Sequence, residues 1–170
     1  MRPLTKNELS LFEGIDFIHG INDCYSLIRN FYRVSFAIDL TNYARPDDWW
    51  HHGMNLYTDF IKSEGFKLIN FDKLNKLQYG DIILMAVKTE MPCHAAIYIG
   101  DGMILHHFYG KRSSLELYKG IWYNTTVSVY RHPKVKIDEE TLTVKAEDDD
   151  RIRNQLLLLQ ERARARGASI

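Results

Sequence analysis

The sequence predicts an α+β fold in which an early helix precedes an antiparallel sheet. A segment near the start of the chain carries apolar residues at the three- and four-residue spacing of a one-faced helix. Between residues 80 and 131, runs rich in isoleucine and valine alternate with glycine-containing turns, which is typical of strands. A helix followed by consecutive strands with short connections is characteristic of α+β proteins.

Two helices are expected in the first half of the chain. Asn22-Asp23 provides an N-terminal cap for the first. The apolar residues that follow on one face are Leu27, Ile28, Phe31 and Tyr32. A second helix is expected from Met54 to Lys62, where Ser63-Glu64-Gly65 ends it.

Four strands are expected after residue 80. They cover residues 82–87, 95–99, 103–108 and 127–130. The second and third are separated only by Gly100-Asp101-Gly102, so they are expected to form a hairpin, and His94 opens the first strand of that hairpin.

The chain divides into three zones. Residues 1–136 are expected to form one folded domain. Residues 137–150 are expected to be an acidic linker, because this stretch carries seven acidic side chains and one basic side chain. Residues 151–170 hold good helix formers and four consecutive leucines, and we expect a docking helix over residues 151–166 that needs a partner surface.

Composition excludes several classes of protein. The chain has 170 residues with 22 basic and 22 acidic side chains, so no net positive charge favours nucleic acid. No apolar run reaches the roughly 20 residues of a membrane-spanning helix. The first residues lack the basic-then-apolar pattern of a secretion signal, and two cysteines are too few for a disulfide framework. We therefore expect a soluble protein made in a reducing compartment.

Cys24 is the first candidate for chemistry. It lies in the first turn of the expected helix, where the positive end of the helix dipole stabilises a thiolate, the nucleophilic form of cysteine. The alternative is a buried structural cysteine, which is the commoner fate of a lone cysteine.

His94 and the pair His106-His107 are candidates for a base beside Cys24. With a three-residue turn, Ala96 faces His106, and His94 lies diagonal to His106 on the same sheet face, about 7–8 Å away between backbones. A two-residue turn would bring His107 to that face instead. The residues alone leave this register open.

Together these residues predict nucleophilic cysteine catalysis. A cysteine at a helix start, a histidine on a following strand and a polar residue on the next strand supply the nucleophile, its base and a group that orients the base. No metal or cofactor is expected. Zinc binding by Cys93, His94, His106 and His107 is an alternative, which the opposite directions of neighbouring strand residues disfavour.

Three segments resemble the NlpC-type papain-like cell-wall cysteine peptidases. They are Asp23–Arg29, Gly80–Leu84 and His94–His106. The spacing of His94 and His106 matches the family pattern and selects His106 over His107. Within the family, three further segments resemble the peptidase domain of tail-tip assembly proteins of lambda-like phages: Arg45–Trp50, Ile104–Phe108 and Leu117–Trp122.

The resemblance implies a compact papain-like fold with the catalytic helix packed on a central antiparallel sheet. It implies that Cys24 attacks an amide bond in peptidoglycan stem peptides, that His94 is the general base and that His106 orients His94. It also implies a virion protein of the phage tail tip, made in the host cytoplasm and acting in the host periplasm. Other tail-tip proteins are its expected partners, through residues 151–166.

Four residues are candidates for contacts with the substrate: Asp23, Tyr25, Trp49 and Trp50. The two tryptophans belong to an aromatic loop that either rims a cleft or is buried against the sheet. Tyr25-Ser26 stands where the family usually has a small Ser-Gly pair. The tyrosine that family enzymes often have upstream of the cysteine is also missing, and Phe12, Phe17 and His19 are the nearest candidates for its place.

Two other functions stay open. A structural tail-tip protein can retain a peptidase fold with a blocked or unused active site, because fold does not fix function. An amidase or acyltransferase of the same superfamily would use the same chemistry on another substrate. Reactivity of the thiol distinguishes the first alternative, and the reaction products distinguish the second.

Overall fold

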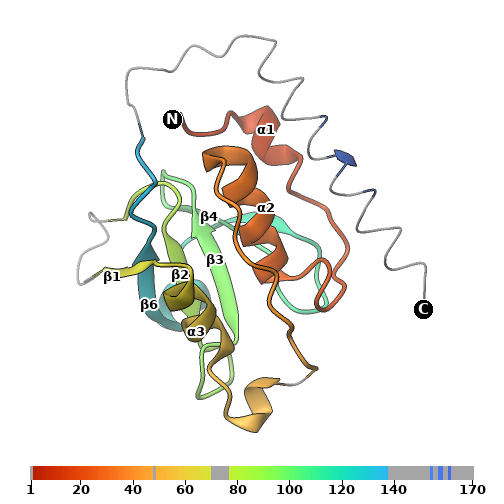
Figure 1. Ribbon diagram of the computed structural model, residues 1–170, viewed down its shortest axis with the longest axis vertical. Coiled ribbons are helices and arrows are strands. Elements are labelled where there is room, and N and C mark those ends of the chain that lie inside the picture. The colour runs from red at the N-terminus through yellow and green to blue at the C-terminus, as the bar shows by residue number, and fades with distance from the viewer. Residues whose placement is uncertain are drawn as a thin grey trace.

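The computed structural model describes residues 2–47, 49–69 and 77–137, together with residues 154, 157, 158 and 161 (Figure 1). The expected acidic linker at 137–150 and the docking helix at 151–170 therefore lie almost entirely outside the described residues.

An antiparallel sheet forms the centre of the described domain, with strand order β1-β6-β2-β3-β4-β5. The strands are β1 (Lys67–Ile69), β2 (Ile82–Met85), β3 (His94–Tyr98), β4 (Met103–His106), β5 (Ser114–Leu117) and β6 (Thr126–Arg131). Strands β2 to β5 follow one another as a meander, whereas β6 returns to the free side of β2. The expected α+β fold is confirmed.

The helices cover the sheet and its ends. They are α1 (Lys6–Ser10), α2 (Cys24–Phe36), α3 (Leu56–Ser63), α4 (Ile121–Asn124) and the short 3-10 helix η1 (Trp49–His52). Figure 1 shows α2 lying alongside β3. Both helices expected from the sequence form, although α3 begins at Leu56, two residues later than predicted. Within the described residues, no helix has the length and apolar character to cross a membrane.

The alternation of side chains along the strands divides the core between the two faces of the sheet. Ile82 and Leu84 of β2 belong to the cluster that also holds the buried face of α2. Ile83 and Met85 face the opposite way and pack in a second cluster. The central strands are thus buried on both sides, which explains why they read as unbroken apolar runs.

The Gly80-Asp81 pair, just before β2, contacts α2 and β6. Gly80 has a φ of +89°, and a side chain there would meet the Phe36 ring at 2.7 Å, so only glycine fits. The buried carboxylate of Asp81 accepts two hydrogen bonds of 2.7 Å from Arg131 on β6. Arg131 therefore has a structural role in the sheet.

The hairpin of β3 and β4 has the three-residue turn. Ile99 donates a backbone hydrogen bond of 3.0 Å to Met103, and Ala96 lies opposite His106. This is the register that puts His94 and His106 on the same sheet face. Strands β1 and β5 are short and partly exposed, and neither was expected from the sequence.

Candidate active site

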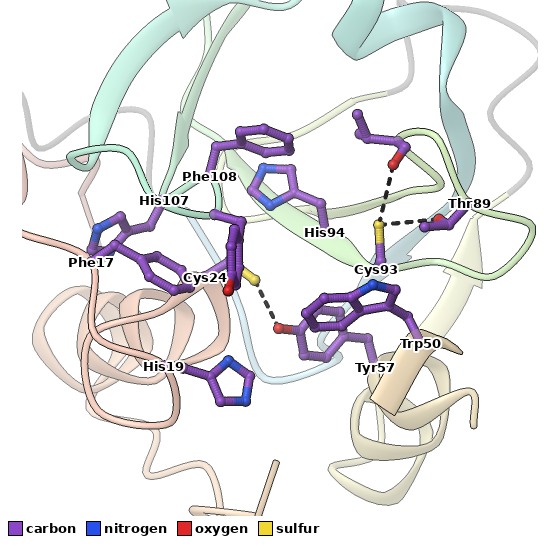
Figure 2. Close-up of a pocket in the computed structure, with 12 residues that line it drawn as sticks. Phe17, His19, Cys24, Trp50, Tyr57, Thr89, Cys93, His94, His107 and Phe108 are labelled. Carbon is purple, nitrogen blue, oxygen red and sulfur yellow. Dashed lines mark hydrogen bonds between the residues drawn. The ribbon is translucent and has the colours of Figure 1, made fainter. Parts of the chain in front are cut away.

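The start of α2 and the start of β3 meet at a cavity of about 170 Å³ (Figure 2). Side chains from several elements line it, among them Cys24, Trp50, Tyr57, His94, Phe108 and Tyr109. In Figure 2 the sulfur of Cys24 lies between the side chains of His94 and Tyr57. The cavity therefore brings together the expected nucleophile and the expected base.

Cys24 is placed by the cap of α2. The carboxylate of Asp23 accepts a hydrogen bond of 2.8 Å from the backbone N–H of Ser26, which fixes the first turn of the helix. Cys24 is 4% exposed, and its thiol donates to the hydroxyl of Tyr57 at 3.0 Å. The nucleophile candidate is thus both buried and hydrogen-bonded.

The pKa of the Cys24 thiol is raised, whereas its place at a helix start suggests a lowered pKa. Burial raises the pKa to about 12, and the neighbouring Asp23 carboxylate adds to the rise. The Tyr57 hydroxyl and the backbone of Ala95 act in the other direction but do not outweigh burial. Cys24 is therefore a neutral thiol at physiological pH.

Asp23 and Arg45 form a buried ion pair beneath the site. Arg45 Nε lies 2.6 Å from Asp23 Oδ2, and the Arg45 side chain is fully buried. Arg45 also donates to the carbonyl of Gly20 at 2.9 Å and to the hydroxyl of Ser26 at 3.0 Å. Burial opposes the charge on Asp23, but Arg45 and Ser26 hold the pKa of its carboxyl below its usual value.

His94 and His106 are joined directly. His94 Nε2 lies 3.0 Å from His106 Nδ1, and both rings are buried. Burial lowers the pKa of both imidazoles, and for His94 the neighbouring His106 and His107 lower it further. Both rings are consequently neutral near pH 7.

Two aromatic side chains enclose the histidine pair. The ring centroids of Trp122 and His106 are 4.5 Å apart, and Phe108 meets His94 edge-on at 5.2 Å. These contacts shield the pair from solvent and fix the two ring planes.

Glu116 on β5 lies beyond His106 and was not among the expected site residues. Its Oε1 is 3.1 Å from His106 Nε2, and its Oε2 accepts a hydrogen bond of 2.7 Å from the indole N–H of Trp122. The alternation around Leu115 and Leu117 is a strand signal that would have placed Glu116 on the polar face.

Tyr57 was also missed. It lies on the buried side of α3, the helix that the sequence does predict, yet no local pattern distinguishes it from a core tyrosine. Its hydroxyl is fully buried beside Cys24. Burial raises the pKa of Tyr57 well above its usual value, and the interaction with Cys24 adds to the rise. Tyr57 therefore stays protonated and keeps a proton to donate.

His107 does not replace His106. It is buried, and its ring meets Phe17 edge-on at 5.3 Å on one wall of the cavity. The three-residue turn of the hairpin puts His106, and not His107, opposite Ala96. Burial lowers the pKa of His107 as well.

Of the four candidates for substrate contacts, Trp50 alone lines the cavity. Trp49 is 0% exposed and packs on Tyr57 with 4.8 Å between ring centroids, so the buried-staple alternative describes it. Tyr25 is buried and donates through its hydroxyl to the Thr41 carbonyl. Asp23 is engaged in the helix cap and the ion pair.

Three aromatic rings from separate segments meet at the cavity. Tyr109 has ring centroids 5.0 Å from Phe17 and 5.8 Å from Trp50. We call Phe17, Tyr109 and Trp50 the aromatic bridge. Figure 2 shows Phe17 and Trp50 on opposite sides of Cys24, so the bridge crosses the region where a substrate would approach.

The described residues contain no cluster of three or more histidine, cysteine or carboxylate side chains with the geometry of a metal site. Cys93 lies 3.1 Å from the hydroxyl of Thr89. Arg112 and Asp16 form an exposed ion pair, with 2.9 Å between Arg112 Nε and Asp16 Oδ1.

Residues 14–131 match the sequence signature of the NlpC/P60 family. The chain is 40% identical over 119 residues to the tail tip assembly protein K of Escherichia phage lambda, covering 70% of this chain and 58% of that protein. It is 32% identical over 136 residues to the tail tip assembly protein K of Escherichia phage N15, covering 79% of this chain and 54% of that protein. The chain thus spans little more than half the length of these curated relatives.

Proposed function

The chain belongs to the NlpC/P60 family, and from this premise we propose that it is a cysteine peptidase of a phage tail tip. Its proposed substrate is an amide bond in the stem peptides of peptidoglycan. The observation that carries the proposal is that Cys24 and His94 line one cavity while His106 is hydrogen-bonded to His94. The two relatives named for tail tip assembly support the tail as the setting.

In the proposed reaction, the Cys24 proton passes to His94, and the thiolate attacks the carbonyl carbon of the scissile amide. The tetrahedral intermediate collapses when His94 returns the proton to the leaving amine. This step breaks the C–N bond and leaves a thioester on Cys24. Water, deprotonated by His94, then attacks the thioester, which releases the acid and restores the thiol.

The buried thiol needs its base at the moment of attack. With a thiol pKa raised to about 12 by burial, almost no thiolate exists at neutral pH. Proton transfer to His94 therefore accompanies the attack, and the charge that develops is stabilised by donors already in place. The backbone N–H of Cys24 at the helix start and the Tyr57 hydroxyl are the proposed donors to the oxyanion.

The test is a digest of Gram-negative peptidoglycan with the wild type, Cys24→Ala and the matched control Cys93→Ala, read by mass spectrometry. We expect a cut stem peptide with the wild type and with Cys93→Ala and none with Cys24→Ala. Activity in Cys24→Ala would overturn the mechanism. An altered stem without a cut peptide bond would indicate an amidase or acyltransferase instead.

A structural tail protein with an unused site is the second candidate. The observation in its favour is that Cys24 is almost completely buried beside the aromatic bridge. Alkylation of Cys24, followed by peptide mapping that separates it from Cys93, distinguishes the two. A thiol that resists iodoacetamide in the wild type, and a digest without products, together favour the structural role.

We further propose that other tail-tip proteins are the partners, bound through residues 151–166, and that the host periplasm is the place of action. The support is the leucine run of that segment and the tail role in the names of both relatives. Substituting two of its leucines with glutamate is expected to abolish incorporation into tails while peptidoglycan hydrolysis persists.

A further inference from the structure

A carboxylate and two imidazoles lie next to one another across three strands of the sheet. Ala96 of β3 and Ser114 of β5 lie directly opposite His106 on either side of β4. His94 is two residues before Ala96, and Glu116 is two residues after Ser114, so both share the face of His106. The line therefore runs from Glu116 through His106 to His94 across three neighbouring strands.

Glu116 is held in place as an ionised carboxylate. The indole N–H of Trp122 donates to its Oε2 at 2.7 Å, and the Ser114 hydroxyl donates to its Oε1 at 3.1 Å. Partial burial raises the pKa of Glu116, but the hydrogen bond from Trp122 and the interaction with His106 lower it more, so the net pKa lies below its usual value. The side chain of Glu116 is 44% exposed, and this access to water also favours the charged form.

An ionised carboxylate only accepts hydrogen bonds. The 3.1 Å contact between Glu116 Oε1 and His106 Nε2 therefore requires the proton to be on Nε2. The contacts of the Ser114 hydroxyl support the proton on Nε2. Its hydroxyl proton is directed to Glu116, so at 3.4 Å from His106 Nε2 its oxygen is left to accept.

The position of the proton on His106 determines the position of the proton on His94. A neutral imidazole carries one N–H, so a proton on His106 Nε2 leaves a lone pair on its Nδ1. That lone pair accepts across the 3.0 Å contact from His94 Nε2, which must then carry the proton of His94. His94 Nδ1 is left unprotonated, as a base requires.

We propose that Glu116 is a positioning residue that fixes His106 and His94 in the Nε2–H tautomer and so keeps His94 Nδ1 ready to accept the Cys24 proton. The tautomer assignment rests on the hydrogen bonds of Glu116, its ionised state and the contacts that join it to His106 and His94, and the catalytic consequence of that assignment rests on the proposed function. Without the carboxylate, the reverse pattern with both protons on Nδ1 satisfies the His94–His106 bond equally well. In that pattern His94 has no lone pair for Cys24.

The charged and titratable groups facing the pair are few. Glu116 comes from β5, His107 follows His106 on the chain, and Cys24 comes from α2. Phe108 and Trp122 cover the remaining sides with aromatic carbon. Among the described residues at the pair, Glu116 is therefore the group that supplies a negative charge, and it raises the pKa of His106 against the effect of burial.

The test is histidine tautomer assignment by 15N NMR on the full chain with labelled histidine. In the wild type we expect both His94 and His106 with a protonated Nε2 and an unprotonated Nδ1. In Glu116→Gln, the single amide oxygen stays with the Trp122 donor, which turns the amide NH₂ toward His106. We expect the His106 proton to shift toward Nδ1, and Glu13→Gln is the matched control because Glu13 contacts the β5 backbone at Leu115 without reaching His106.

A wild-type spectrum with the proton on His106 Nδ1 overturns the proposal, even if Glu116→Gln fails to fold. An unchanged tautomer in a folded Glu116→Gln overturns it too. For the hydrolysis, we expect kcat/KM to fall by roughly 10- to 100-fold in Glu116→Gln and the acid limb of its pH profile to move to lower pH. The NMR result does not depend on hydrolysis, so a failure of the proposed function is separable from a failure of this inference.

Discussion

The Cys24 thiol stands between opposing influences on its pKa. Burial and the Asp23 carboxylate favour the neutral thiol, whereas the helix start, Tyr57 and the Ala95 backbone favour the thiolate. At the scale of one residue, burial prevails because no full positive charge contacts the sulfur among its described neighbours. The reactive form therefore has to be created by proton transfer to His94.

Removing the Tyr57 hydroxyl tests this balance. Tyr57→Phe keeps the ring contact with Trp49 but removes the hydrogen bond to Cys24, so the thiol pKa is expected to rise further. We expect severalfold slower alkylation of Cys24 at pH 9 and a loss of about 1 kcal/mol in the free energy of unfolding. The rate is measured with iodoacetamide and peptide mapping.

Tyr43→Phe is the control, because Tyr43 stacks on Phe60 in the same aromatic layer without contacting the thiol. Equal alkylation rates in both variants and the wild type would show that the Tyr57 hydrogen bond has no effect on the thiol.

The N-terminus of α2 depends on a single buried ion pair. Asp23 caps the helix and pairs with fully buried Arg45, which in turn binds the Gly20 carbonyl in the segment before the helix. At the scale of this element, one carboxylate fixes both the helix start and the approach of the 41–47 segment. Cys24 is placed by the same contacts.

Asp23→Ala leaves Arg45 buried and unpaired. We expect it to lower the free energy of unfolding by about 3–5 kcal/mol, as for other broken buried pairs. The matched control is Asp39→Ala near the C-terminus of the same helix, where the pair with Arg33 is exposed and worth at most about 1 kcal/mol. Urea unfolding measures both, and similar losses in the two variants would contradict the role of the buried pair.

Stability of the whole domain is tied to neutral histidines. The fold lowers the pKa of four of them by burial: His94, His106, His107 and His132. The unfolded chain takes up protons near pH 6.5 while these buried rings do not, so the unfolded state binds more protons below that pH. Stability is therefore complete above about pH 6.5 and is lost progressively as the pH falls through and below that value.

We expect the free energy of unfolding to change little between pH 7.5 and about pH 6.5 and to decrease from there to pH 5.5, at constant ionic strength. Carboxylates with lowered pKa, such as Glu116, remain ionised across this range and do not contribute to the slope. Replacing His107 with glutamine is expected to make the slope shallower. A stability that is flat or rises toward pH 5.5 would contradict the neutral, buried state of these rings.

Features of the fold that depend on neighbouring residues could be predicted from the amino-acid sequence. The Asn22-Asp23 pair predicts where α2 begins, because a helix start needs a side chain to accept the free N–H groups. Gly100-Asp101-Gly102 predicts the hairpin. Once the length of its turn is known, strand geometry places His94 and His106 on the same face of the sheet. These are local rules, and they were sufficient for the fold class, whereas the family was inferred from the resemblance of three sequence segments.

Features that depend on contacts between distant segments follow only from the folded chain. Trp49 and Trp50 are neighbours, but in a 3-10 helix successive side chains point about 120° apart, so one enters the core and the other the cavity. Tyr57 reaches Cys24 through the packing of α3, and Glu116 reaches His106 through the pairing of β5. Burial then reversed the expected pKa of Cys24, because the cost of desolvating a charge is set by the surrounding fold and not by the sequence next to it.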